Sequence, residues 1–296
     1  MAGPLRELER AGHCNVTWVP VVPGTGRWTV ESVLAAVTPH TCLVTLMIAN
    51  NETGILQPVA ELFSALRSLT PAPTRPLLLH TDAAQAVGKL PVSVTELQAD
   101  LLSLAGHKFY GPRVGALYVR AGTKLTPMFY GGGQEAGQRA GTENTVMVAG
   151  LGAAASLVTA NLAQYSAHMR EMRDYLRDRL ISSFMLVTGE ERRPLGRGEV
   201  CWRYLPLHTL PNTLSVRLGG QTGAELLARC AGKVEASTGA ACHTGAGPSQ
   251  VLLASFLWGE VGARETVRLS VGRETTREVI DRAVGALVQA VYGGNK

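Results

Sequence analysis

Several features that would narrow the function are missing from the sequence. Its 296 residues include five cysteines, an odd number, and they lack the paired spacing of a zinc site or a disulfide framework. The sequence also has no basic run and no basic–aromatic stripe of the kind that follows a nucleic-acid backbone. We therefore expect a protein of a reducing compartment, the cytosol, with no metal site and no nucleic-acid partner.

Long apolar runs are also missing. No run reaches the length of a membrane span, and the strongest candidate, residues 146–160, is rich in glycine and alanine and predicts a buried helix. The first 15 residues lack the hydrophobic core of a secretory signal and resemble the end of a helix that runs into a strand. We therefore expect no membrane partner.

The first half of the chain alternates apolar runs with amphipathic segments. Repeated strand–helix–strand units are typical of an α/β fold with a doubly wound, mainly parallel sheet. The expected elements are strands at residues 16–22, 43–49, 77–79, 101–105 and 115–119, and helices at 29–37 and 58–69.

The second half predicts a smaller α+β unit joined to the first by two helices. The second of these helices, residues 164–184, carries interspersed charges that are typical of a solvated face. We expect two domains, residues 1–163 and residues 164–296. The other expected elements are a helix at 144–161, strands at 214–218, 234–237 and 266–271, and helices at 223–231, 248–258 and 276–291.

Two charged residues follow two neighbouring predicted strands. Asp82 lies in His80-Thr81-Asp82 after one apolar run, and Lys108 lies in Gly106-His107-Lys108 after the next. Ligands of open α/β sheets bind at the carboxyl ends of the strands, so these two side chains are expected to emerge side by side. A structural ion pair or two unrelated surface residues is the alternative.

An aspartate and a lysine in this arrangement suit pyridoxal 5′-phosphate. The lysine forms a Schiff base with the aldehyde, and the aspartate pairs with the protonated pyridine nitrogen. A freed lysine amine can then serve as a general base for the substrate α-proton. Lys108 is therefore the candidate catalytic residue, and Asp82 a candidate cofactor-binding residue.

At these motifs the sequence resembles a known family. The segments HTDAAQAVGK, GHKFYGPR, GGGQE, GTEN, AACH and RLSVGR are similar to the cysteine desulfurase and selenocysteine lyase group of the class V aminotransferases. The resemblance extends from about Leu43 onward and is strongest to the animal selenocysteine lyase branch. It implies a fold-type I pyridoxal-phosphate enzyme, with residues 1–163 as a partial cofactor-binding domain and residues 164–296 carrying a catalytic cysteine loop.

The resemblance assigns roles to further residues. Asn51 and Gln85 match residues that contact the phenolate oxygen of the cofactor, although on spacing alone Gln85 could equally face solvent. His107 matches a histidine near the phosphate, with a structural or capping histidine as the alternative. Thr142 matches a threonine that reaches the phosphate of the partner subunit, which implies a homodimer; a helix N-cap at Thr142 is compatible with the same geometry.

Two residues of the C-terminal half match the part of the family site that acts on substrate. Cys242 aligns with the cysteine that takes the chalcogen atom from the substrate, although a buried inert thiol is the commoner fate of a single cysteine. Arg268 matches the arginine that holds the substrate α-carboxylate, which a guanidinium can clamp with two hydrogen bonds.

The sequence also departs from the family pattern. Ala105 stands where the family often has a serine or threonine that contacts the phosphate; the selenocysteine lyase branch tends to be apolar there. The family's N-terminal segment, with a phosphate-cradling loop and a ring-stacking histidine, is not found. We expect a fragment, a truncated isoform or an incomplete gene model, with weakened cofactor binding.

The resemblance implies a lyase that converts L-selenocysteine to L-alanine and releases selenium, with a possible acceptor protein for that selenium. A cysteine desulfurase that supplies sulfur is the alternative within enzymes, and nothing in the residue chemistry decides between the two elements. A catalytically silent chain that acts as a dimerisation or binding partner is the alternative of another class. An aminotransferase of the same fold is a weaker one.

Overall fold

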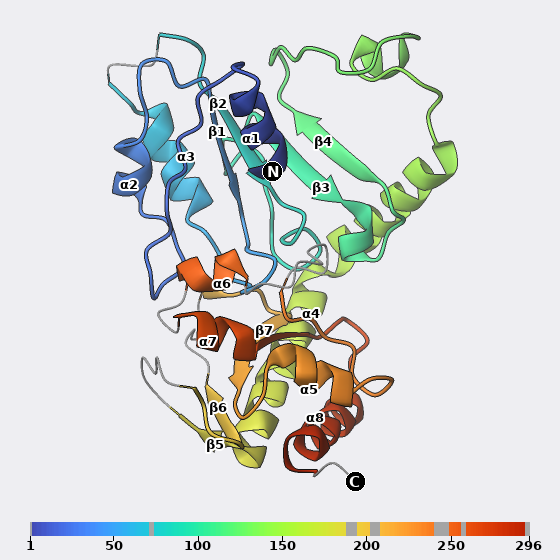
Figure 1. Ribbon diagram of the computed structural model, residues 1–296. Helices are drawn as coiled ribbons and strands as arrows, with labels where there is room; N and C mark the ends of the chain where they lie inside the picture. Colours follow the sequence, from blue (N-terminus) through green and yellow to red (C-terminus); the bar gives the residue numbers. More distant parts are fainter. Residues whose placement is uncertain are drawn as a thin grey trace.

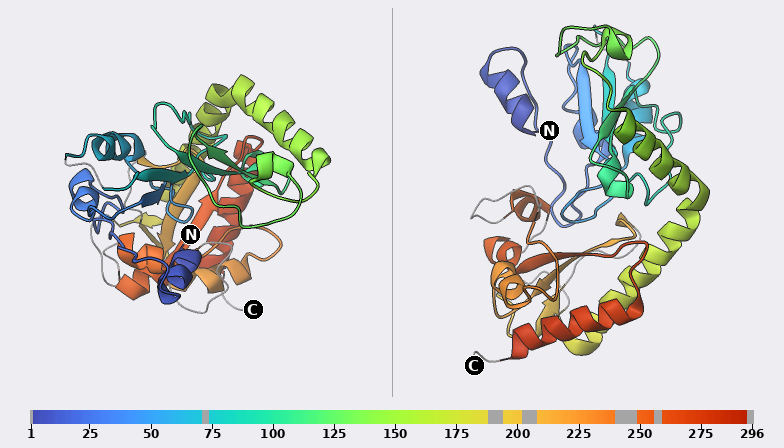
Figure 2. Two further views of the ribbon diagram at one scale, coloured as in Figure 1. Left: turned by 90° about the horizontal axis from the view of Figure 1, so that it is seen from above. Right: turned by 90° about the vertical axis from the view of Figure 1, so that its right-hand side faces the viewer.

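The computed structural model describes residues 2–70, 74–187, 194–201, 208–239, 249–255 and 259–293. The chain forms two lobes, each built on a four-stranded sheet (Figure 1). A long helix, α4 (Thr145–Ser183), runs along one side of both lobes (Figure 2). A short N-terminal helix, α1 (Ala2–Arg10), has no buried residue and stands apart from the first sheet in the same figure.

The first sheet has the strand order β1-β2-β3-β4. Its strands are β1 (Leu43–Met47), β2 (Leu78–Asp82), β3 (Leu101–Ala105) and β4 (Gly115–Val119). The first three strands are parallel, and β4 is antiparallel to β3. These four strands were expected from the apolar runs, and the mainly parallel arrangement is confirmed.

The strand expected at residues 16–22 is not formed. That stretch has only an isolated bridge between Val22 and Arg27. Pro20 interrupts it and Pro23 follows it directly. A proline has no N–H to donate to a neighbouring strand, so a β-branched composition is not sufficient here.

Helices α2 (Val30–Leu34) and α3 (Val59–Arg67) pack against one face of the first sheet. The Thr29 hydroxyl accepts a hydrogen bond from Ser32 N at 3.1 Å and thereby caps the N-terminus of α2. The apolar side chains of these helices meet those of β1 and β2 in a buried cluster. Its fully or nearly fully buried members are Val33, Leu46, Val59, Leu62, Phe63, Leu66, Leu79 and Ala99.

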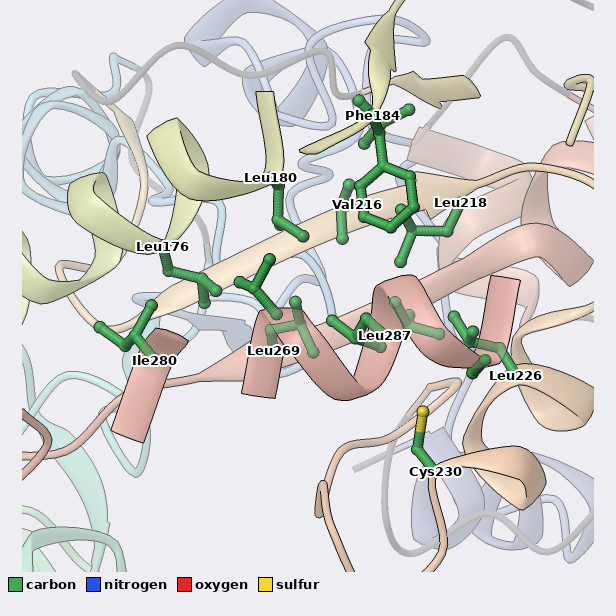
Figure 3. Close-up of a cluster of buried hydrophobic side chains, with 14 of the residues drawn as sticks. Leu176, Leu180, Phe184, Val216, Leu218, Leu226, Cys230, Leu269, Ile280 and Leu287 are labelled. Atoms are coloured by element: carbon green, nitrogen blue, oxygen red, sulfur yellow. The ribbon is translucent and has the colours of Figure 1, made fainter. Parts of the chain in front are cut away.

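The second sheet has the order β5-β6-β7-β8, with strands β5 (Met185–Leu186), β6 (Glu199–Cys201), β7 (Thr213–Leu218) and β8 (Thr266–Ser270). Its helices are α5 (Gly223–Arg229), α6 (Gln250–Ser255), α7 (Gly259–Glu265) and α8 (Arg277–Tyr292). Figure 3 shows the core of this lobe, where Leu176 and Leu180 of α4 face Leu269 of β8 and Ile280 and Leu287 of α8.

Two expectations for this half are wrong. Thr145–Ser183 forms one continuous helix rather than two, and the expected domain boundary at residue 163 falls inside it. Residues 234–237 form no strand beyond an isolated bridge from Ser237 to Arg268, and α7 was not foreseen. Nothing in the sequence around Asn161 breaks the helix, because it contains neither proline nor glycine.

The expectation that residues 146–160 form a buried helix is also wrong. Val146 is 77% exposed, Val148 54% and Leu157 51%. Among the described residues, α4 is the one helix long and apolar enough to cross a membrane. A single helix of this kind is weak evidence for a membrane span. The first half of α4 is thus an apolar surface of the chain as it stands.

A short hydrogen-bonded connection joins the two lobes beside the carboxyl end of β1. Leu56 N donates to His208 O and Leu210 N donates to Gly54 O, both at 2.8 Å. The buried Arg173 of α4 donates from Nη1 to Leu210 O at 2.9 Å. The helix therefore anchors the segment that links the lobes.

Candidate active site

The carboxyl ends of β1, β2 and β3 lie together and face the second lobe (Figure 1). Ile48 N donates to Asp82 O, and Ala83 N donates to Ser103 O, each at 2.9 Å, so the strand ends are in register. Asn51 follows β1, Asp82 ends β2, and Lys108 follows β3. The sheet therefore brings three of the predicted site residues to one edge.

Asp82 is half-buried at this edge. Its Oδ1 accepts a hydrogen bond from Ala84 N at 2.9 Å, and within the described chain its Oδ2 has no hydrogen-bond partner. A half-buried carboxylate oxygen without a donor is available to a ligand that carries an N–H group.

His80 lies two residues before Asp82 on the same face of β2. Its ring nitrogens lie 2.6 Å from Thr45 Oγ1 and 3.0 Å from Ser103 Oγ, so the imidazole bridges β1 and β3. Burial lowers the pKa of His80, and the nearby charge of Asp82 partly opposes that shift. This neutral bridge fixes the three strands directly behind the carboxylate.

Lys108 lies in the 3₁₀ turn η1 (Gly106–Phe109), and its side chain is exposed, as is that of His107. The turn starts at a glycine because a Cβ on Gly106 would lie 2.7 Å from Pro112 O. Gly111 N donates back to Gly106 O at 2.9 Å and closes the turn. A tight, locally hydrogen-bonded turn thus presents Lys108 at the end of β3.

Arg268 reaches this edge from the second lobe. It lies in β8, is half-buried, and donates from Nη1 to the carbonyl of Asn51. Its backbone N also donates to Ser237 O at 2.6 Å, in the segment that leads toward Cys242. The structure therefore places Arg268 and Asn51 in direct contact.

Cys242 lies outside the described residues, but the described residues on either side of it are close to the same edge. Ser249 Oγ donates to the carboxylate of Glu52, which is buried and follows Asn51 directly. A Cβ built on Gly239 would lie 3.4 Å from Glu52 Oε2. Both flanks of the segment with Cys242 therefore lie beside Glu52.

Two predicted residues are less closely tied to the edge. Gln85 lies half-buried in the turn after Asp82. Thr142 is exposed, and it is not the N-cap of α4, because the Asn144 side chain accepts the bond from Met147 N at 3.2 Å. The start of α4 lies at the far right of Figure 1, away from the carboxyl ends of β1–β3. The structure therefore does not bring Thr142 to the other site residues of its own chain.

Sequence reasoning overlooked Lys89, which belongs to the quoted motif HTDAAQAVGK. Its side chain is buried, with 7% exposure, and its Nζ donates to Lys108 O at 3.1 Å. A charged residue just after a turn glycine normally predicts a solvated position, so only the packing of the turn reveals it. In the part of the chain that the structure describes, no group of three or more histidine, cysteine, aspartate or glutamate side chains could hold a metal ion.

Comparison with known proteins identifies the family. A sequence model described as "Aminotransferase class-V" matches residues 2–283. The chain is 48% identical over 309 aligned positions to the selenocysteine lyase of Xenopus tropicalis, which covers all of this chain and 69% of that protein. It is 36% identical to a cysteine desulfurase IscS of Methanosarcina thermophila, which covers 96% of this chain and 65% of that protein. The chain therefore belongs to the aminotransferase class-V family.

The fold agrees with this assignment. A solved structure described as a NifS-like protein superimposes with a TM-score of 0.83 at 28% identity, which covers 97% of this chain and 71% of the other. The match shows the architecture of a fold-type I pyridoxal-phosphate enzyme, and the family uses pyridoxal 5′-phosphate.

The residues at the strand ends fit this cofactor. Asp82 offers a half-buried carboxylate oxygen for a pyridinium N–H, and Lys108 offers an exposed amine in the turn after the neighbouring strand. Asn51 and Arg268 supply polar groups from both lobes. The donor set is thus one carboxylate, one amine, one amide and one guanidinium.

Proposed function

We propose that the chain is a pyridoxal-phosphate-dependent selenocysteine lyase, which converts L-selenocysteine to L-alanine and passes the selenium to a reduced acceptor. The placement of Asp82 and Lys108 at neighbouring strand ends, with Arg268 of the other lobe in contact with Asn51 after the adjacent strand β1, carries the proposal. The higher identity to a selenocysteine lyase, 48% against 36% for a cysteine desulfurase, supports selenium over sulfur.

Each of the proposed site residues has a defined task. The bound cofactor would supply an electron sink for the substrate α-carbon. Lys108 would anchor it and afterwards move the α-proton, while Asp82 would hold the proton on the ring nitrogen. Arg268, which donates to the carbonyl of Asn51, would clamp the substrate carboxylate with two hydrogen bonds.

Three further roles belong to the proposal. The Cys242 thiolate would accept the selenium atom, and this is supported by the position of Gly239 and Ser249 beside Glu52. Asn51 and Gln85 would contact the phenolate oxygen, and His107 the phosphate. Localisation in the cytosol is supported by Cys14, Cys42 and Cys230, which have no disulfide partner among the described residues.

A homodimer is also part of the proposal, with Thr142 serving the site of the partner subunit. Besides the first half of α4, the chain exposes Met128 (86%), Phe129 (57%) and Tyr130 (81%), close in sequence to Thr142. Contiguous exposed apolar surface of this kind marks protein interfaces. The exposure of this surface supports a second copy of the chain as the partner.

The test is product formation by the chain as it stands, since it spans about 69% of the length of the Xenopus tropicalis relative. Purified protein with excess cofactor should form alanine from selenocysteine faster than from cysteine. Lys108→Ala and Cys242→Ser should each lower the rate at least 100-fold, because each removes a group that acts at the reacting atoms. Equal or faster turnover of cysteine would replace the proposal by a cysteine desulfurase.

An aminotransferase and a catalytically silent chain would each give a different result. Turnover that is unchanged in Cys242→Ala would indicate an aminotransferase, which needs no thiol. A protein that shows no cofactor absorbance band in excess pyridoxal phosphate, yet still self-associates, would indicate a silent dimerisation partner.

A further inference from the structure

We propose that Lys89 is a positioning residue for Lys108. Its buried ammonium holds the backbone carbonyl of Lys108 and thereby fixes the turn that presents the Lys108 side chain. The inference deepens the proposed function and rests on it, because it concerns the residue that would anchor the cofactor.

Lys89 contacts Lys108 directly, and hydrogen bonds hold the backbone on the Lys89 side of this contact. Lys89 is 7% exposed, and its Nζ donates to Lys108 O at 3.1 Å. The backbone around it is held by a series of turns after β2, in which Lys89 N donates to Ala86 O at 3.0 Å and Leu90 N donates to the same oxygen at 2.9 Å. Local backbone hydrogen bonds thus hold the residue that carries the ammonium.

The Lys108 carbonyl needs a donor from outside its own turn. In a continuing helix it would accept from residue 111 or residue 112. Gly111 N is already committed to Gly106 O, and Pro112 has no N–H. Lys89 supplies the missing donor, and this explains why a long cationic side chain reaches into this position.

The turn that carries Lys89 is packed tightly against the turn that carries Lys108. Gly88 has a φ of +79°, and a Cβ placed on it would lie 2.5 Å from Phe109 Cβ. Only glycine permits so close an approach of the two backbones. The two turns therefore move as one unit, with Gly88 as the contact and Lys89 as the hydrogen bond.

Burying the Lys89 ammonium costs free energy of desolvation, and packing alone does not explain why this cost is borne. Burial, with a smaller contribution from the charge of Lys108, lowers the pKa of Lys89 to about 8. Across the described ranges, no salt bridge includes Lys89. An apolar side chain would fill the same space without the desolvation penalty, so the ammonium is retained for the bond that it makes.

A rival support for the turn comes from the second lobe. The Tyr110 hydroxyl accepts from Arg273 N at 2.9 Å, and the Arg273 guanidinium lies 4.1 Å from the centre of the Tyr110 ring. If this contact alone fixed the turn, Lys89 would be dispensable. The experiment must therefore separate the two.

The experiment compares Lys89→Met with wild type and with Lys233→Met, which removes an exposed lysine that donates to Gln289. The first readout is amide hydrogen exchange of cofactor-free protein. We expect exchange in residues 106–111 to speed up at least tenfold in Lys89→Met, with residues 277–292 unchanged. Lys233→Met should leave residues 106–111 as in wild type.

The second readout is the fraction of Lys108 that carries a pyridoxyl group after borohydride reduction at limiting cofactor, which should fall several-fold in Lys89→Met. Lys89→Gln, which keeps a shorter donor, takes the place of Lys89→Met should that variant not fold, and it should shift both readouts in the same direction. Unchanged exchange and unchanged labelling in the folded variant would overturn the inference. Absence of label at Lys108 in wild type would instead overturn the proposed function, while the exchange result would still report on the turn.

Discussion

The two halves of α4 differ in composition and in surroundings, because residues 145–162 carry no charged side chain and residues 163–183 carry many. In the second half Met169, Met172, Leu176 and Leu180 are buried in the core of the second lobe. In the first half Val146 and Val148 are more than half exposed. Figure 2 shows the same helix passing from the side of the first lobe to the side of the second. Apolar spacing thus predicts that a surface must be covered, and tertiary structure decides what covers it.

Within the described residues, the first half contacts its own chain along one side. That side packs on the turn that carries Lys108, where a Cβ on Gly150 would lie 3.3 Å from Pro112 and a Cβ on Gly111 would lie 3.1 Å from Ala154. The second half instead packs a stripe of large buried side chains, Met169, Met172, Leu176 and Leu180, against α8 and the second sheet (Figure 3). The first half is therefore anchored at the candidate site and open elsewhere.

The largest expected effect comes from truncating one leucine in each half of α4. Leu180→Ala removes a fully buried side chain and should lower the free energy of unfolding by about 2–5 kcal/mol. Leu157→Ala, the matched control at 51% exposure, should cost less than about 0.5 kcal/mol in the dilute protein. Urea unfolding measures both, and equal losses would show that the halves do not differ.

Arg173→Met tests the anchor in the second half. It removes the donor to Leu210 O, and a buried carbonyl without a partner costs about 1–3 kcal/mol. Arg177→Met, the control one turn further along, breaks partly exposed ion pairs with Asp174 and Asp178 and should cost less than about 1 kcal/mol. Urea unfolding measures both variants. A larger loss of unfolding free energy in Arg177→Met than in Arg173→Met would contradict this prediction.

Val148→Asp tests whether the exposed half is a self-association surface. A charge at this position should weaken dimerisation at least tenfold, which is about 1.4 kcal/mol, because it cannot be buried against an apolar partner. Val279→Asp, at another exposed helical valine, should have no such effect. Sedimentation velocity over a concentration series measures both. A wild-type chain that stays monomeric at all concentrations would remove the proposed dimer.

The smallest expected effect on stability concerns a polar contact that the second half of α4 makes with Asp281. Arg179 donates to Asp281 at 2.6 Å, and Tyr175 donates to the same carboxylate at 3.0 Å. The bond from Arg179, with help from Tyr175, lowers the pKa of Asp281 below its usual 3.8. The contact therefore stabilises the fold above pH 3.8 and loses this contribution as the pH falls through the lowered pKa.

Asp281→Asn should accordingly be slightly less stable than wild type at pH 7, and the difference should vanish in strong acid. Thermal unfolding at a series of pH values measures this. A difference that grows as the pH falls would contradict the assigned sign.

Much of the first sheet could be predicted from the sequence, because its strands are continuous apolar runs whose ends carry the polar residues. The runs before Asp82 and Lys108 needed only local pattern and the rule for parallel sheets. The helix break near Asn161 was predicted from a change in composition, whereas the backbone there is uninterrupted. The composition of a helix can change where its surroundings change, while its backbone continues without a break.

The candidate site was foreseen in part for the same reason. Asn51, Asp82 and Lys108 lie on consecutive strands, so topology alone brings them together. The contact between Arg268 and Asn51 depends on how two sheets pack, which spacing cannot show. The burial of Lys89 and Glu52 was not visible in the sequence, because charged residues in turns normally face solvent.

The central claim is that Lys108 anchors pyridoxal 5′-phosphate at the carboxyl edge of the first sheet. It is tested most directly by incubating the protein with the cofactor, reducing it with borohydride and mapping the pyridoxyl group by peptide mass spectrometry. The account predicts a single labelled lysine, Lys108, and no label in Lys108→Ala. A pyridoxyl group on another lysine, with Lys108 unmodified, would contradict it.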